Sequence, residues 1–126
     1  MKQILATITV AVTLVASSAS AFDPAHLKRL KDTGDCINCD LMGAKLYSAK
    51  LWGAKLVNAN LVNADLSGAY LKSANLSGAK LNSAILTEAE LSGANLTGAK
   101  LNYATMKSAI FCNTTMPDGS VLYTGC

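Results

Sequence analysis

The chain has 126 residues, with 11 Lys and Arg against 8 Asp and Glu, and a formal net charge of +3 at pH 7. Its hydrophobic fraction of 51% is raised by alanine and by the apolar N-terminus, so it does not indicate a membrane protein. The positive charge is mild and evenly spread, which argues against nucleic acid as a partner.

The first 21 residues have the build of a cleaved secretory signal. Lys2 precedes an apolar run from Ile4 to Val15, and small residues at 19–21 suit a cleavage site. The run is too short to span a membrane, which takes about 20 residues. We expect a mature chain that begins at Phe22 and is exported to the periplasm, a lumen or the cell exterior, with no stable membrane insertion after cleavage. An uncleaved anchor is the alternative.

Residues 22–38 are predicted to form an N-terminal cap with a short helix. Asp23 suits the N-cap position, and Gly34 suits the end of the helix. Leu27 and Leu30 would share one helical face. We expect this face to cover the start of the next segment.

From residue 39 onward, the sequence repeats every five residues. An apolar residue stands at the centre of sixteen units, and a small residue, mostly Ala, lies two places before each centre. A helix would scatter residues five apart around its surface, and a flat strand would place them on alternate faces. The pattern instead predicts a solenoid, whose units stack to bury a shared core. The centres are Leu41, Leu46, Leu51, Leu56, Leu61, Leu66, Leu71, Leu76, Leu81, Leu86, Leu91, Leu96, Leu101, Met106, Phe111 and Met116.

Units such as ANLSG, ADLSG and ANLTG resemble the A-[DN]-L-x-x pattern of the pentapeptide-repeat family over residues 39–118. That family has four units per coil. The resemblance therefore implies an all-β fold, a right-handed quadrilateral β-helix of about four coils, with a C-terminal cap at 119–126. The flanks CINCDL and FCNTTMPDGS are similar to the caps of exported bacterial members. Five lysines stand where the family commonly has Asp or Asn: Lys45, Lys50, Lys55, Lys80 and Lys100.

With this geometry, the four cysteines can only pair locally. Cys39 and Cys112 would lie roughly 17 Å apart at strand spacing, whereas bridged Cα atoms lie within about 7 Å. We predict the disulfides Cys36–Cys39 and Cys112–Cys126, each locking a cap of an exported chain. The same distance excludes a four-cysteine zinc site. A redox role for Cys36 and Cys39 is the alternative.

The sequence contains no recognisable catalytic, metal-binding or cofactor-binding set. His26 is the only histidine, and no second base or ligand accompanies it, so we expect it to pack within the cap. Glu88 and Glu90 would lie on different sides of a corner, and a straight rod offers no cleft. We expect a protein without enzyme activity.

Outward positions of the first coil carry an apolar belt, while later units mostly carry Ser, Thr, Asn or Lys there. The belt consists of Met42, Tyr47, Trp52, Val57 and Val62. One interpretation is that the cap folds over part of the belt. The other is a docking surface for another protein, with Tyr47 and Trp52 as its main contacts.

The expected function is a non-enzymatic exported structural or protein-interaction module, with its partner and oligomeric state open. DNA mimicry, as in gyrase-binding relatives, is disfavoured by export, by the positive charge and by a rod of only about 20 Å. Ice binding would need one outward residue repeated along a side, and the threonines form no such column. A secreted thiol-disulfide redox protein remains the alternative.

Overall fold

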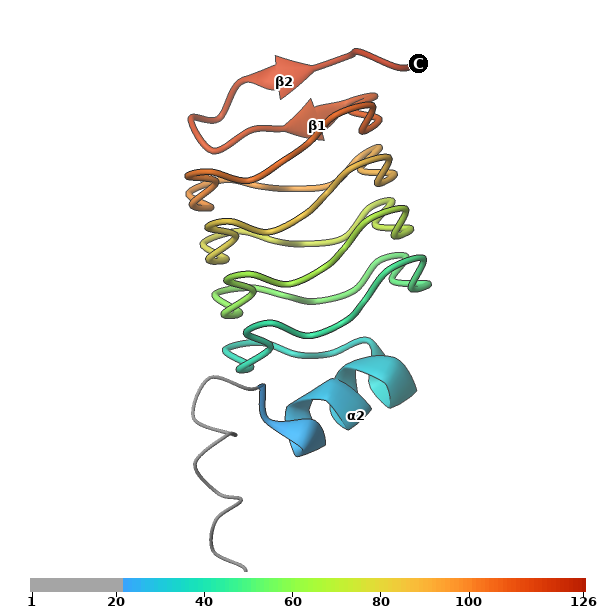
Figure 1. Cartoon of the computed structure of the whole chain (residues 1–126). Coiled ribbons are helices and arrows are strands. Elements are labelled where there is room, and N and C mark those ends of the chain that lie inside the picture. Colours follow the sequence, from blue (N-terminus) through green and yellow to red (C-terminus); the bar gives the residue numbers. More distant parts are fainter. Residues whose placement is uncertain (1–21) are drawn as a thin grey trace, which may run out of the picture.

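The computed structural model describes residues 22–126, which form a cap helix, a stack of coils and a terminal strand pair (Figure 1). The signal-like segment 1–21 lies outside the described residues. Its cleavage and the export of the chain therefore stay predictions.

Helix α2, Pro24–Thr33, lies across the N-terminal end of the stack (Figure 1). Asp23 caps it by accepting a hydrogen bond from the Ala25 N–H at 2.9 Å, and proline at the first position has no N–H to leave unpaired. Gly34 ends the helix with φ 74°, and its N–H donates to the Leu30 carbonyl at 2.8 Å. Leu30 is buried, so the helix covers the apolar end of the coils as the sequence suggests.

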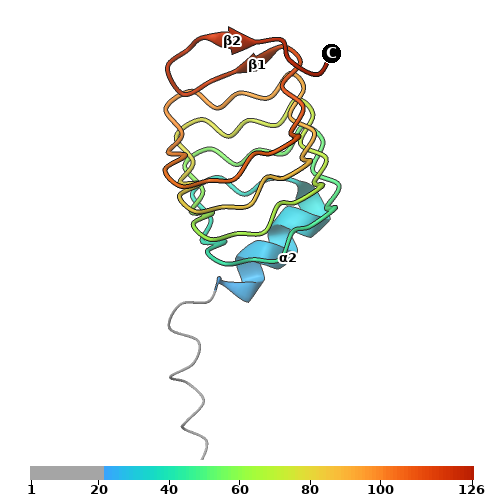
Figure 2. The same ribbon diagram turned by 45° about the horizontal axis from the view of Figure 1, so that its top comes forward.

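The coils are joined by parallel backbone bridges between residues twenty apart, such as Lys45 with Asp65. The Leu41 N–H donates to the Asn60 carbonyl at 2.8 Å, and the Asn60 N–H donates to the Cys39 carbonyl at 2.8 Å. Four five-residue units therefore complete one turn, and Figure 2 shows these turns stacked on one another. The resulting fold is a repeat β-helix. Its right-handedness is expected from the family resemblance.

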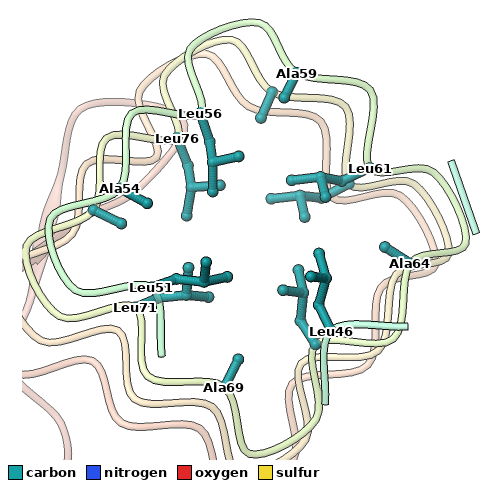
Figure 3. Close-up of a cluster of buried hydrophobic side chains, with 14 of the residues drawn as sticks. Leu46, Leu51, Ala54, Leu56, Ala59, Leu61, Ala64, Ala69, Leu71 and Leu76 are labelled. Carbon is teal, nitrogen blue, oxygen red and sulfur yellow. The ribbon is translucent and has the colours of Figure 1, made fainter. Parts of the chain in front are cut away.

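Leucine and alanine side chains fill the centre of the coils, where Figure 3 shows them pointing inward from a four-cornered wall. The central leucines from Leu41 to Leu96 are at most 4% exposed, and most of the preceding alanines are buried too. Each buried leucine contributes about 1.5–3 kcal/mol. The predicted inward direction of the repeat is confirmed by this burial.

Every unit ends in a tight turn, which forms a corner of the wall. The Ala44 N–H donates back to the Leu41 carbonyl at 3.0 Å, and this bond recurs along the stack. The last residue of each unit, which precedes this alanine or the Cys or Thr in its place, has a positive φ from Asn38 to Asn113. Glycine adopts this conformation at little cost. Glu88 and Tyr103 adopt it as well, at a cost of about 1–3 kcal/mol each.

Asp and Asn side chains brace several corners. Asp65 Oδ1 accepts hydrogen bonds from the Ser67 N–H at 3.0 Å and from the Ser67 hydroxyl at 2.6 Å. Asn75 accepts the same two bonds from Ser77, and Asn95 accepts them from the threonine two residues on. Side chains of this type mimic a backbone turn in this way. This bond gives Asp or Asn a structural role at the position before the central leucine.

The C-terminal end carries two short strands, β1 (Thr114–Thr115) and β2 (Val121–Leu122), which pair antiparallel. Strand β2 lies within residues 119–126, where the C-terminal cap is expected. The pair covers the end incompletely, because Met106 and Phe111 are only half-buried.

A charged residue in the lumen should prevent stable folding. Leu76 is fully buried, so Leu76→Asp would place an unpaired carboxylate among leucines and lower the free energy of unfolding by several kcal/mol. The neighbouring Ser77→Asp change keeps the lumen intact and removes only the exposed hydroxyl bond to Asn75, so it should cost no more than about 1 kcal/mol. Denaturant unfolding followed by circular dichroism measures both, and equal losses would contradict the inward and outward assignment.

The corner bond at Asp65 should make stability depend on pH. The Ser67 hydroxyl and N–H, followed by the weaker attraction of Lys45, lower the pKa of Asp65 below its ordinary value of 3.8. Asp65 therefore adds stability above that ordinary value, and the gain is lost as the pH falls through the lowered pKa.

Asp65→Asn should keep the corner bond without the titration, as Asn75 does, and should reduce the loss of stability between neutral and strongly acidic pH. The reverse change, Asn75→Asp, should increase it. Urea unfolding midpoints at both pH values test this pair. An unchanged pH dependence in both variants would show that these corners do not contribute to it.

Candidate functional site

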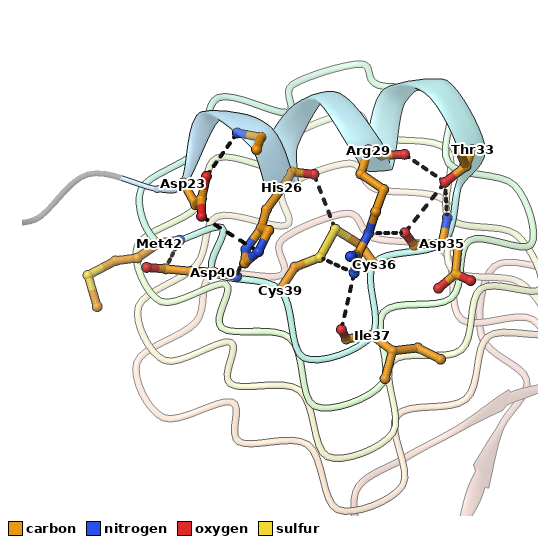
Figure 4. The surroundings of a disulfide bond; sticks show 11 residues. Asp23, His26, Arg29, Thr33, Asp35, Cys36, Ile37, Cys39, Asp40 and Met42 are labelled. Carbon is orange, nitrogen blue, oxygen red and sulfur yellow. Dashed lines mark hydrogen bonds and ion pairs between the residues drawn. A yellow bond between two sulfur atoms is a disulfide. The ribbon is translucent and has the colours of Figure 1, made fainter.

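Both predicted cysteine pairs lie at bonding distance. The sulfur atoms are 2.07 Å apart in Cys36–Cys39 and 2.05 Å apart in Cys112–Cys126. The first pair lies beneath α2 with its residues 0% and 1% exposed (Figure 4). In the second pair, Cys126 is exposed and Cys112 is half-buried. The two ends of the stack are therefore tied by bridges of very different accessibility.

Side chains of α2 enclose the first bridge and tie the helix to the first coil (Figure 4). The Arg29 guanidinium donates to the Asp35 carbonyl at 3.0 Å and to Cys39 Sγ at 3.1 Å. His26 Nδ1 accepts the Asp40 N–H at 2.8 Å, which is the cap-packing role expected for this residue. Thiol-disulfide exchange needs an accessible sulfur, so this enclosure argues against a redox role.

A shallow groove of about 280 Å³ is formed by one side of α2 and the residue Phe22 before it. Its charged groups do not form a catalytic set, because Lys28 is already paired with Asp32. Across residues 22–126, no three His, Cys, Asp or Glu side chains are placed to hold a metal ion, and no helix is long and apolar enough to cross a membrane. The groove is lined by Phe22, Pro24, Leu27, Lys28, Lys31 and Asp32.

The predicted belt is unevenly exposed. Tyr47 and Trp52 are 62% and 55% exposed, whereas Met42, Val57 and Val62 are half-buried. Helix α2 lies across the end of the stack and not along its walls (Figures 1 and 2). The two aromatic side chains consequently stand on neighbouring corners of the first coil without a cover from the cap.

Tyr70 extends this surface beyond the residues of the predicted belt. Its ring centroid lies 5.4 Å from that of Trp52, with the planes tilted by 34°. Tyr70 precedes a central leucine and is bridged to Lys50 one coil earlier. The twenty-residue register could have revealed this neighbour, because Tyr70 follows Lys50 by one full coil.

Exposed lysines alternate with these aromatic residues along the first coil. Lys45 and Lys50 flank the Tyr47 corner, and Lys50 and Lys55 flank the Trp52 corner. Within residues 22–126, none of the three lysines lies within ion-pair distance of a carboxylate. We refer to the following five residues as the aromatic–lysine patch: Tyr47, Lys50, Trp52, Lys55 and Tyr70.

The twenty-residue bridges and the leucine-filled lumen define a solenoid of the β-helix class. The sequence matches the family model "Pentapeptide repeats (8 copies)" over residues 39–78, 53–87 and 74–111. The chain therefore belongs to the pentapeptide repeat family. No curated protein matches the sequence.

Solved structures of pentapeptide repeat proteins are similar to this chain. One from Nostoc Pcc 7120 shares 34% identity over 71% of this chain and 76% of its own, with a TM-score of 0.63. Another, from the cyanobacterium Cyanothece 51142, shares 35% identity over 60% of this chain and 58% of its own, with a TM-score of 0.51.

HetL from Nostoc sp. strain PCC 7120, a pentapeptide repeat protein involved in heterocyst differentiation regulation, shares 44% identity over 71% of this chain, with a TM-score of 0.47. The match spans 40% of that protein.

The two bridges should differ in their resistance to reduction. Brief treatment of the folded protein with dithiothreitol should open Cys112–Cys126 first, because Cys126 is exposed, and should leave the enclosed Cys36–Cys39 bridge intact. Alkylation followed by mass spectrometry identifies the opened bridge. The alternative redox role predicts the reverse order, with Cys36 and Cys39 alkylated first.

Proposed function

We propose that the chain is a non-enzymatic, exported protein-interaction module, which binds another protein through the belt of the first coil. The proposal includes a right-handed stack of about four coils over residues 39–118, between caps at 22–38 and 119–126. The principal contacts are Tyr47 and Trp52, supported by Met42, Val57 and Val62.

The observation that carries this proposal is the exposure of two large aromatic side chains on adjacent corners. Tyr47 and Trp52 point away from the lumen, so the fold does not need them. Tyrosine and tryptophan are the residues that contribute most often to binding energy at protein interfaces. Ser67 and Thr87, which follow Tyr47 at intervals of one coil, are small and polar.

Export is supported by two features of the chain. The first 21 residues have the composition of a secretory signal, and two cysteine pairs lie at bonding distance in the folded part. Disulfides persist mainly in oxidising compartments such as the periplasm or the cell exterior. A periplasmic, lumenal or extracellular location therefore belongs to the proposal.

Affinity purification from the exported fraction tests the proposed function. The double variant Tyr47→Ser/Trp52→Ser should lose the partners that the native chain retains, while its thermal midpoint stays nearly unchanged because neither side chain enters the lumen. Tyr103→Ser/Tyr123→Ser is the matched control, since it removes two exposed aromatic rings from the other end. Equal recovery of the same partners with both double variants would refute the proposal.

A further inference from the structure

A lysine immediately before a central leucine cannot make the stabilising hydrogen bond that Asp or Asn makes at this position. An ammonium group has no acceptor, so it cannot brace the following corner as Asp65 or Asn75 does. The Ser67 N–H donates a hydrogen bond to a side chain. Within residues 22–126, the N–H groups of Tyr47 and Trp52 donate to no side chain. The two aromatic corners are thus among those that lack this brace.

Within residues 22–126, the lysines of the first coil form no ion pair that would compensate for the missing hydrogen bond. Lys50 and Lys55 are exposed and lie beyond ion-pair distance of any carboxylate in this part of the chain. They flank Trp52, whose ring is next to that of Tyr70. Unpaired cations beside exposed rings form a surface that is complementary to anionic groups with apolar neighbours.

The shape of this surface favours a polypeptide over a small molecule or a flat membrane. Small ligands bind in concave sites, and the groove described above is formed by α2 and not by the patch. Lys45, Lys50 and Lys55 belong to three successive units, and four units complete one turn, so these lysines occupy three successive sides of the wall. A plane can lie against one side of the wall at a time, whereas a protein segment can follow the wall around a corner.

We propose that the aromatic–lysine patch binds an acidic segment of a partner protein. Apolar side chains of the segment pack on Trp52 and Tyr70, and its carboxylates pair with Lys50 and Lys55. This inference rests on the proposed function, to which it adds the chemistry of the partner and the contribution of Tyr70.

The only tryptophan of the chain lies in the patch, so its fluorescence reports binding directly. The probe is a short synthetic peptide of Glu, Ser and Leu, added to the oxidised mature protein. It should change the Trp52 emission in a saturable manner that weakens with added salt. The same peptide with Lys in place of Glu, and vesicles of phosphatidylglycerol, should leave the emission unchanged.

Two matched double variants separate the patch from general charge. Lys50→Asn/Lys55→Asn should weaken peptide binding roughly tenfold. Lys80→Asn/Lys100→Asn removes the same charge from the column of Asn60, in later coils and away from the Trp52 corner, and should leave the affinity unchanged. Both variants introduce Asn at brace positions, so neither should lower the unfolding midpoint, and a loss of fold cannot explain a difference in binding.

Several results would overturn the inference: no emission change with the acidic peptide, equal weakening in both double variants, or a response to the vesicles or the Lys peptide instead. If natural partners depend on Tyr47 and Trp52 while the acidic peptide does not bind, the partner chemistry is wrong and the proposed function stands. Retention of every natural partner by Tyr47→Ser/Trp52→Ser would count against the proposed function itself, whatever the peptide does.

Discussion

Backbone pairing between residues twenty apart is the constraint on which this structure depends. Each coil supplies hydrogen-bond partners to the coils beside it, so peptide groups around a dry lumen are satisfied without water. The same pairing fixes which side chains face inward. Leucines such as Leu76 have no alternative position, and residues such as Trp52 are held outside. The outward side chains are therefore placed as regularly as the leucines of the core. Their residue types are not constrained by packing in the lumen.

The five-residue period predicts much of this arrangement. Spacing alone implies an inward leucine and a turn in each unit, and Asp23 and Gly34 indicate the limits of the cap helix. The contact between Trp52 and Tyr70 needs the register of four units per turn as well, which only the family resemblance implies. It joins neighbouring coils, and a period of five does not by itself specify how many units complete a turn. The exposure of the belt likewise depended on the direction in which α2 crosses the end of the stack.

The position before the central leucine serves two purposes. Where it holds Asp or Asn, as at Asp65, the side chain strengthens its own corner. Where it holds lysine, as at Lys50, the charge is available to the surroundings. Stability and binding compete for such positions in many proteins. The first coil of this chain favours charge at three consecutive sides, next to its exposed aromatic rings.

The register of four units per turn also limits how such a chain can change in length. Loss or gain of a single unit would preserve the leucine lining, yet it would rotate every later residue by one side relative to α2. Vertical neighbours such as Lys50 and Tyr70 would be separated when the change falls between them. Duplication or deletion of whole turns leaves these columns in place. Evolution of the rod in increments of twenty residues would thus conserve its surface, whereas smaller steps would create a new one.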